Sequence, residues 1–136
     1  MRIVSENSPR WRAAATSVIV RIESARGAPA ASKLALQLAQ VRFADPSPPV
    51  VTNVEASSCA DGGRLAGLLE QQVTAPVRFT EMVEYMAGQG VDRVLEVGPG
   101  RVLAGLVARI DRKVGRANLS SLESLDEAVA FVNQGA

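Results

Sequence analysis

The residues most suggestive of chemistry lie between Val94 and Leu106, which read V-L-E-V-G-P-G-R-V-L-A-G-L. The apolar run before the glycines predicts a strand, and apolar residues at helical spacing after them predict a helix. A glycine-rich turn at this junction exposes backbone N–H groups at a helix N-terminus, an arrangement that favours anions such as phosphate. A structural turn that needs two flexible residues is at least as consistent with the pattern.

Two nucleotide-binding patterns fit this turn only incompletely. The dinucleotide fingerprint G-x-G-x-x-G requires a third glycine where Leu103 stands. S-adenosylmethionine methyltransferases often begin with V-L-E-V-G-P-G, but they normally continue as G-x-G-x-G, and Val102 occupies that place. They also use an acidic residue after the next strand to bind ribose hydroxyls, and Ser120 and Ser121 stand there. We therefore expect no binding of S-adenosylmethionine.

The sequence contains no histidine. A serine or cysteine nucleophile therefore has no histidine to act as its base, and no metal site can use imidazole ligands. Cys59 is the single cysteine and has no neighbouring base, so we predict an inert loop thiol. One cysteine also excludes an internal disulfide and suits a reducing, cytoplasmic compartment. We expect no metal and no cofactor.

The composition is that of an ordinary globular protein. The chain has 136 residues, of which 47% are hydrophobic and 21% charged, and 15 basic against 14 acidic residues leave a net charge of +1. This length suits one domain. The balanced charge creates no global field that would attract nucleic acid or an anionic membrane. No apolar run approaches the roughly 20 residues of a membrane-spanning helix.

The elements that must position these residues alternate between helices and strands. Apolar stripes predict five helices. The first follows Pro29 and continues to Val41, the second follows Asp61 as its N-cap, and the third runs from Phe79 to Gly88. The fourth follows Gly100, and the fifth begins at a Ser124–Glu127 capping box and continues through Val129 to Val132. Short apolar runs predict strands at Val50–Val54, Arg93–Val97 and near Ala117–Leu119. This alternation indicates an α/β layer with a parallel sheet.

Residues 1–27 differ from the remainder. They carry five arginines against two glutamates, and within them only Thr16–Ile22 predicts a strand. A start rich in arginine and serine is typical of an organelle transit peptide, and it also fits an irregular extension. We therefore predict a separate basic segment over residues 1–27 and a folded region over residues 28–136.

Four motifs follow one another between residue 28 and about residue 133. Pro29-Ala30 with Lys33-Leu34 fits P-A-x-x-x-L, and Pro49–Val54 fits P-V-V-x-N-V. Gln72–Phe79 fits Q-x-x-x-P-V-x-W with another aromatic at its end, and Glu96–Leu106 fits E-V-G-P-G-K-V-L-x-G-L almost throughout. In this order the motifs resemble the C-terminal part of the malonyl-CoA:acyl carrier protein transacylase family.

The resemblance implies a fold, an activity and partners. The fold would be the C-terminal portion of that family's hydrolase-like large subdomain, with a partial parallel sheet. The activity would be transfer of a malonyl group from CoA to the phosphopantetheine thiol of an acyl carrier protein, in fatty acid or polyketide synthesis. The partners would be the carrier protein and the CoA thioester, with no nucleic acid and no membrane.

The family's catalytic groups are not in this sequence. It has no G-H-S-x-G motif for the nucleophilic serine. Aligned without a gap, Glu23 stands where the family has its histidine, and the alternative is that the resemblance stops near Gly27. No catalytic residue is therefore assigned. We expect a fragment that is inactive alone and that associates with a missing N-terminal part. The alternative is a non-catalytic module that binds a carrier protein or completes a split enzyme, and a small methyltransferase comes after it.

Gln72 is the one site residue that the resemblance implies, since it matches the family's glutamine whose backbone carbonyl orients the catalytic imidazole. Gln72 also falls on the apolar stripe of its predicted helix, where a polar side chain needs a specific partner. A glutamine that caps the helix end beside Pro76 fits the same position equally well.

Charged groups supply weaker candidates. A basic cluster follows the glycine-rich turn and its helix, and it would suit an acidic carrier protein or CoA phosphates, although any helix C-terminus attracts cations; its members are Arg109, Arg112, Lys113 and Arg116. Two acidic pairs fall on polar helix faces, where we predict solvated charge, namely Glu81 with Glu84 and Glu123 with Glu127.

Overall fold

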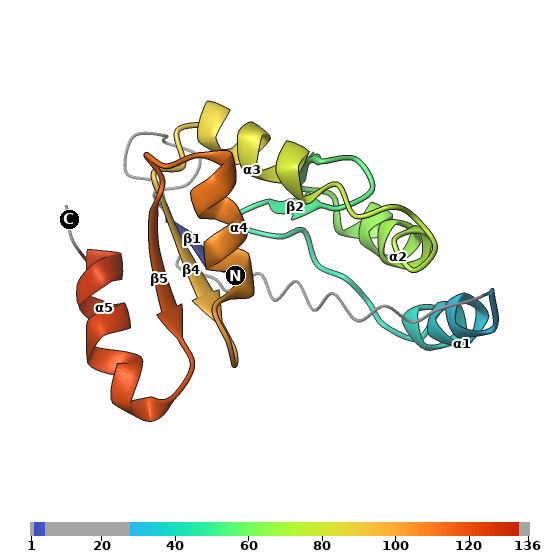
Figure 1. Cartoon of the computed structure of the whole chain (residues 1–136). Helices are drawn as coiled ribbons and strands as arrows, with labels where there is room; N and C mark the ends of the chain where they lie inside the picture. The colour runs from blue at the N-terminus through green and yellow to red at the C-terminus, as the bar shows by residue number, and fades with distance from the viewer. Residues whose placement is uncertain (1, 5–27, 134–136) are drawn as a thin grey trace. The chain divides into compact units, whose positions relative to one another are not determined.

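The structure is a computed structural model that describes residues 2–4 and 28–133 (Figure 1). The chain divides into two compact units: the first comprises residues 21–82, and the second comprises residues 1–20 and 83–136. The predicted strand Thr16–Ile22 and Glu23 lie outside the described residues. No helix within the described ranges is long and apolar enough to cross a membrane.

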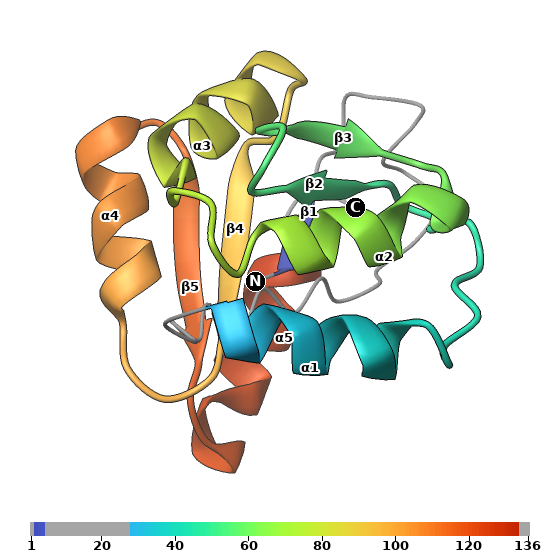
Figure 2. The same ribbon diagram turned by 90° about the vertical axis from the view of Figure 1, so that its right-hand side faces the viewer.

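The first unit packs two helices and a hairpin around a small core. α1 (Ala28–Leu38) packs against α2 (Gly62–Gln71), and β2 (Val50–Thr52) pairs antiparallel with β3 (Ser57–Cys59) (Figure 2). The side chain of Asp61 caps α2 by accepting the N–H of Gly63 at 2.8 Å, as predicted. The core consists of Cys59, Leu65 and Leu68, with Phe43, Val50 and Val54 packed against them.

Two predictions for this unit are wrong in part. The strand predicted at Val50–Val54 ends at Thr52 and belongs to an antiparallel hairpin rather than to a parallel sheet. The chain reverses there because Ala56 takes a left-handed conformation, with φ of 50°, and donates its N–H to the carbonyl of Thr52. Similarly, α1 ends at Leu38, so Val41 lies outside the helix and is 53% exposed.

The second unit is built on a parallel pair of strands. β4 (Arg93–Val97) and β5 (Gly115–Leu119) run parallel and in continuous register, which confirms the predicted α/β class. α4 (Val102–Ile110) connects them, and β1 (Arg2–Val4) pairs antiparallel with the other edge of β4. A 3₁₀ turn (Leu122–Ser124) leads into α5 (Leu125–Asn133), and α3 (Phe79–Gly88) spans the boundary between the units. The hydrolase-like subdomain and the boundary at residue 28 stay predictions.

The helices α4 and α5 lie on the two sides of β4 and β5 (Figure 1). Side chains alternate across a strand, so Arg93 and Glu96 point to opposite faces of β4. Accordingly, the carboxylate of Glu96 bonds to α4, whereas Arg93 Nη1 donates to the carbonyl of Phe131 in α5. A cavity of about 190 Å³ lies beside α5, and its lining is Leu95, Leu119, Leu125, Ala128, Val129, Val132 and Asn133.

The start of the last helix differs from the prediction. No Ser124–Glu127 capping box forms within the described residues; instead the N–H of Ser121 donates to Ser124 Oγ at 3.2 Å, one turn earlier. The predicted apolar stripe is only partly buried. Of the predicted stripe, Leu122 is 85% exposed, Leu125 43% and Val129 50%, whereas Ala128, which was not predicted to belong to it, is 2% exposed. Apolar surface on this helix therefore faces solvent.

Candidate functional site

Gln72 follows the last residue of α2 and serves as its C-cap. Its φ and ψ of −64° and −18° are still helical, and its N–H donates to the carbonyl of Leu68 at 3.1 Å. Its side chain is half-buried rather than part of the core. The stripe predicted through Gln72 is therefore wrong at this end, because the helix stops one residue earlier. The alternative of a capping glutamine describes its position correctly.

The carbonyl of Gln72 is the feature that bears on chemistry. The carbonyls just before it are satisfied by the turn: that of Glu70 accepts the N–H of Val73, and that of Gln71 accepts the N–H of Ala75. Among the described residues no hydrogen bond reaches the Gln72 carbonyl. Unpaired carbonyls at a helix C-terminus carry partial negative charge. This oxygen can accept an N–H from a group outside the described residues.

Asn53 holds the segment that follows Gln72, and the sequence analysis assigned it no role. Its side-chain Nδ2 donates to the carbonyl of Pro76 at 2.9 Å, and its Oδ1 accepts the N–H of Arg78 at 2.8 Å. The residue is 9% exposed. Its place at the end of an apolar strand could have indicated a buried amide that needs partners, but the sequence does not show which groups those partners are.

Arg78 adds a second connection between the same two segments. Its Nη1 donates to the carbonyl of Val54 at 2.8 Å, and its Nε donates to Glu81 Oε1 at 2.9 Å. These hydrogen bonds from Arg78 lower the pKa of Glu81 below its usual value and raise the pKa of Arg78. Glu81 is exposed at the start of α3, as predicted, and it is ion-paired with Arg78.

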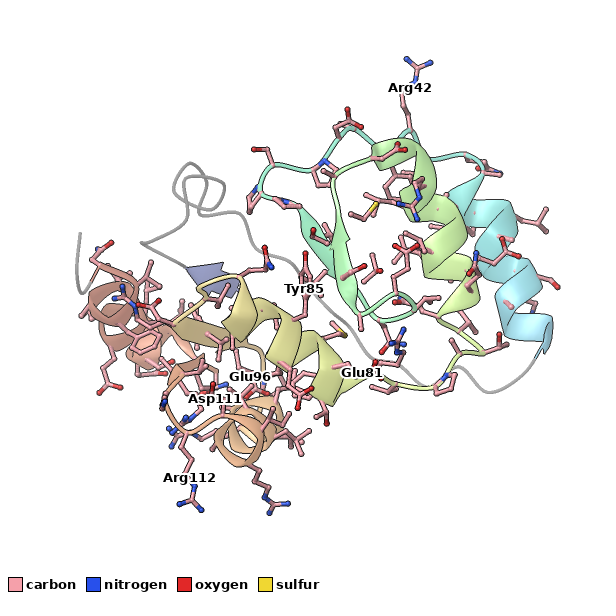
Figure 3. The ribbon with its side chains drawn as sticks, turned by 90° about the horizontal axis from the view of Figure 1, so that it is seen from above. Arg42, Glu81, Tyr85, Glu96, Asp111 and Arg112 are labelled. Carbon is pink, nitrogen blue, oxygen red and sulfur yellow. The ribbon has the colours of Figure 1, made fainter. Side chains whose placement is uncertain are left out.

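In the second unit, the glycine-rich turn is closed by Glu96 from the strand before it. Glu96 Oε2 accepts the N–H of Ala104 at 2.8 Å, and Oε1 accepts that of Leu103 at 3.2 Å. The residue is 7% exposed. Figure 3 labels its side chain. Two first-turn amides of α4 that could bind a phosphate, those of Leu103 and Ala104, are therefore already occupied by a carboxylate of the same chain.

Asn118 fixes the other side of this turn. Its Nδ2 donates to the carbonyl of Gly100 at 2.7 Å, with longer contacts to the carbonyls of Glu96 and Gly98. Gly98 and Gly100 have φ of 135° and 90°, which side-chain-bearing residues rarely adopt. Of the two predictions for this turn, the geometry favours a structural turn over a phosphate cradle.

The basic cluster lies at the C-terminal end of α4, on the loop to β5 and at the start of β5. All four side chains belong to exposed residues, and Arg112 points away from the helix (Figure 3). Arg116 Nη1 donates to the carbonyl of Val114 at 2.6 Å, so part of its capacity is used locally. Across the described ranges no ion pair joins Arg109, Arg112, Lys113 or Arg116 to an acidic residue.

The remaining candidates are placed away from any catalytic arrangement. Cys59 ends β3 in the core at 1% exposure and donates to the carbonyl of Asp61 at 3.4 Å, so it is buried in a strand rather than held in a loop as predicted. Glu84, Glu123 and Glu127 are exposed. Within the described residues, no group of three His, Cys, Asp or Glu side chains could hold a metal ion.

Comparison with known proteins shows a partial similarity to one enzyme family. No family model matches the chain. The malonyl CoA-acyl carrier protein transacylase of Escherichia coli K12 is 49% identical over 82 residues, which cover 60% of this chain and 26% of that enzyme. The crystal structure of an acyl carrier protein S-malonyltransferase from Vibrio cholerae superposes with a TM-score of 0.67 at 40% identity, covering 73% of this chain. The chain matches the C-terminal part of the malonyl-CoA:acyl carrier protein transacylase family.

The match to these transacylases is partial on their side. The chain spans about a quarter of the Escherichia coli transacylase and 32% of the Vibrio cholerae structure. A malonyl-transacylase in complex with its type II PKS acyl-carrier protein matches equally well, with a TM-score of 0.68 at 41% identity over 75% of this chain and 33% of its own. The resemblance inferred from the four motifs is therefore confirmed, together with the fold class.

Proposed function

We propose that this chain forms the C-terminal part of a malonyl-CoA:acyl carrier protein transacylase and is inactive alone. The observation that carries the proposal is the ordered set of family motifs on a fold that superposes on solved transacylases. The reaction is acyl exchange, in which a malonyl group leaves the CoA sulfur for an enzyme serine and then passes to the carrier protein thiol. The cellular location that we propose is the cytoplasm.

The role of this part in the reaction is to orient the catalytic base rather than to supply the nucleophile. A serine hydroxyl needs a base to take its proton near neutral pH, and this sequence has no histidine to serve. The Gln72 carbonyl, at the negative end of α2, would accept the N–H of a histidine supplied by the remainder of the enzyme. Accepting that N–H fixes the imidazole with its other nitrogen directed at the serine.

The carrier protein is the proposed macromolecular partner. One of the matched structures is a transacylase in complex with such a protein. The exposed basic cluster, which makes no ion pair among the described residues, supplies a positive surface for an acidic partner. A partner recognised in this way would bind less tightly as salt concentration rises, because exposed charges are screened.

The proposal is tested with radiolabelled malonyl-CoA. We expect the purified chain to retain no label after denaturation and to transfer none to acyl carrier protein. We expect label transfer to appear when the chain is co-expressed with the part of the Escherichia coli transacylase that lies outside the match. Label bound covalently to a serine of the chain alone would contradict inactivity, and a silent co-expressed pair would contradict the assignment to a transacylase.

A non-catalytic module that binds a carrier protein is the second candidate, and the exposed basic cluster supports it. It predicts saturable binding of acyl carrier protein by the chain alone, without activity in the co-expressed pair. A methyltransferase is disfavoured, because Glu96 occupies the helix amides at the turn. We expect calorimetry to detect no binding of S-adenosylmethionine, and micromolar binding would reinstate that function.

A further inference from the structure

We propose that Asn53 is the residue that positions the Gln72 carbonyl for the reaction. This inference rests on the proposed function, and it concerns a residue to which the family resemblance gives no role here. The connection from Gln72 to Arg78 has no regular structure of its own. Its geometry must therefore come from contacts with another part of the first unit, and the Asn53 side chain makes two of them.

The contacts of Asn53 imitate the pairing of a β-strand. One side-chain amide accepts the N–H of Arg78 and donates to the carbonyl of Pro76, two residues apart in a chain that runs alongside it. Both bonds lie between 2.8 and 2.9 Å, and the residue is 9% exposed. Buried hydrogen bonds of this kind fix direction as well as distance.

The turn from Gln72 to Ala75 is held from both ends. At the helix end, the N–H groups of Val73 and Ala75 bond back to the carbonyls of Glu70 and Gln71. At the other end, the carbonyl of Pro76 is bonded to Asn53. Gln72 lies inside this closed turn, so its carbonyl has one direction relative to α2 and the hairpin. Loss of the Asn53 bonds frees one end of the turn.

Among the common side chains only a short amide fits this role. Asp at position 53 would still accept the N–H of Arg78, but it would place a carboxylate oxygen against the carbonyl of Pro76. Ala would leave both backbone groups without partners in a buried place. Asn53→Asp and Asn53→Ala therefore remove one bond and two bonds, respectively, and form a graded pair.

The first test uses the full chain and nuclear magnetic resonance. In Asn53→Ala we expect the Arg78 amide hydrogen to exchange at least tenfold faster, and the ¹³C shift of the Gln72 carbonyl to move. In Asn53→Asp we expect the Arg78 amide hydrogen to stay protected from exchange, while the ¹³C shift of the Gln72 carbonyl still moves. This variant replaces Asn53→Ala in the test if the alanine variant does not fold. Gln37→Ala, an amide deletion on the exposed face of α1, is the matched control and should change neither. An unmoved Gln72 shift in a folded variant would overturn the proposal.

The second test uses the chain co-expressed with the remainder of the Escherichia coli transacylase. Misplacing a group that orients a catalytic residue lowers turnover by roughly 10- to 100-fold. We expect Asn53→Ala to lower kcat to this extent while KM for malonyl-CoA stays constant, and Gln37→Ala to change neither. Equal kcat in Asn53→Ala and the parent pair would refute positioning. A pair that is inactive without any substitution refutes the proposed function, while the resonance result still decides the role of Asn53.

Discussion

At the scale of single residues, two buried polar side chains set the geometry of two segments, the glycine-rich turn before α4 and the connection from Gln72 to Arg78. Glu96 is held by the first-turn amides of α4, and Asn53 is held by backbone on both sides of Val77. Neither role could be predicted from the sequence. The sequence of a glycine-rich turn is the same whether its backbone amides are free or hydrogen-bonded. Which of the two holds depends on where a carboxylate from the preceding strand points.

We expect Glu96→Ala to lower the free energy of unfolding by about 2 kcal/mol, since two charge-assisted hydrogen bonds to a helix N-terminus are lost. Urea denaturation followed by circular dichroism measures this change. Glu127→Ala, which removes an exposed carboxylate from α5, is the control and should change the unfolding free energy by less than about 0.5 kcal/mol. Equal stability of the two variants would show that the Glu96 contacts contribute nothing.

At the scale of elements, the helix ends and strands that adjacent residues specify were predicted correctly. Elements that form only by pairing with distant segments were not. The Asp61 cap and the strand over Arg93–Val97 were correct, because each is specified by a few adjacent residues. β3 was missed because Ser57–Cys59 carries neither alternation nor β-branched residues, and it forms only by pairing with β2. The end of α2 was placed too late, since apolar spacing continues past the residue at which the helix stops.

The turn before α4 gives a prediction at this scale. Gly98 and Gly100 have positive φ, with no atom within 4 Å of an added Cβ, so alanine there costs backbone strain alone. We expect Gly100→Ala to lower the unfolding free energy by about 1–2 kcal/mol. Gly105→Ala in α4 also has open space, but its helical backbone should raise stability by up to about 1 kcal/mol. Equal changes in the unfolding free energy for Gly100→Ala and Gly105→Ala, measured by urea denaturation, would contradict backbone strain at position 100.

At the scale of the whole chain, apolar surface limits its behaviour in solution. Leu122, Val102 and Leu36 are 85%, 70% and 68% exposed, and a parallel sheet is normally covered on both faces. We expect the purified chain to melt over a broader range than a complete domain and to associate into oligomers in gel filtration as its concentration is raised. Co-expression with the remainder of a transacylase should sharpen the melt. A monodisperse monomer with a steep, cooperative melt would instead indicate a self-sufficient module.

The reactivity of the Cys59 thiol reports whether the core of the first unit is open or closed. The sequence has one cysteine, and its sulfur lies at 1% exposure beneath α2, so a thiol reagent reaches it only when this unit opens. When reclosing is fast, each 1.4 kcal/mol of opening free energy slows labelling by about tenfold relative to an unfolded thiol. A disulfide-exchange reagent whose released thiolate is yellow would thus measure the opening of the first unit. No cysteine has to be introduced, and the second unit gives no signal. Labelling at the unfolded rate would show that this core is open in solution.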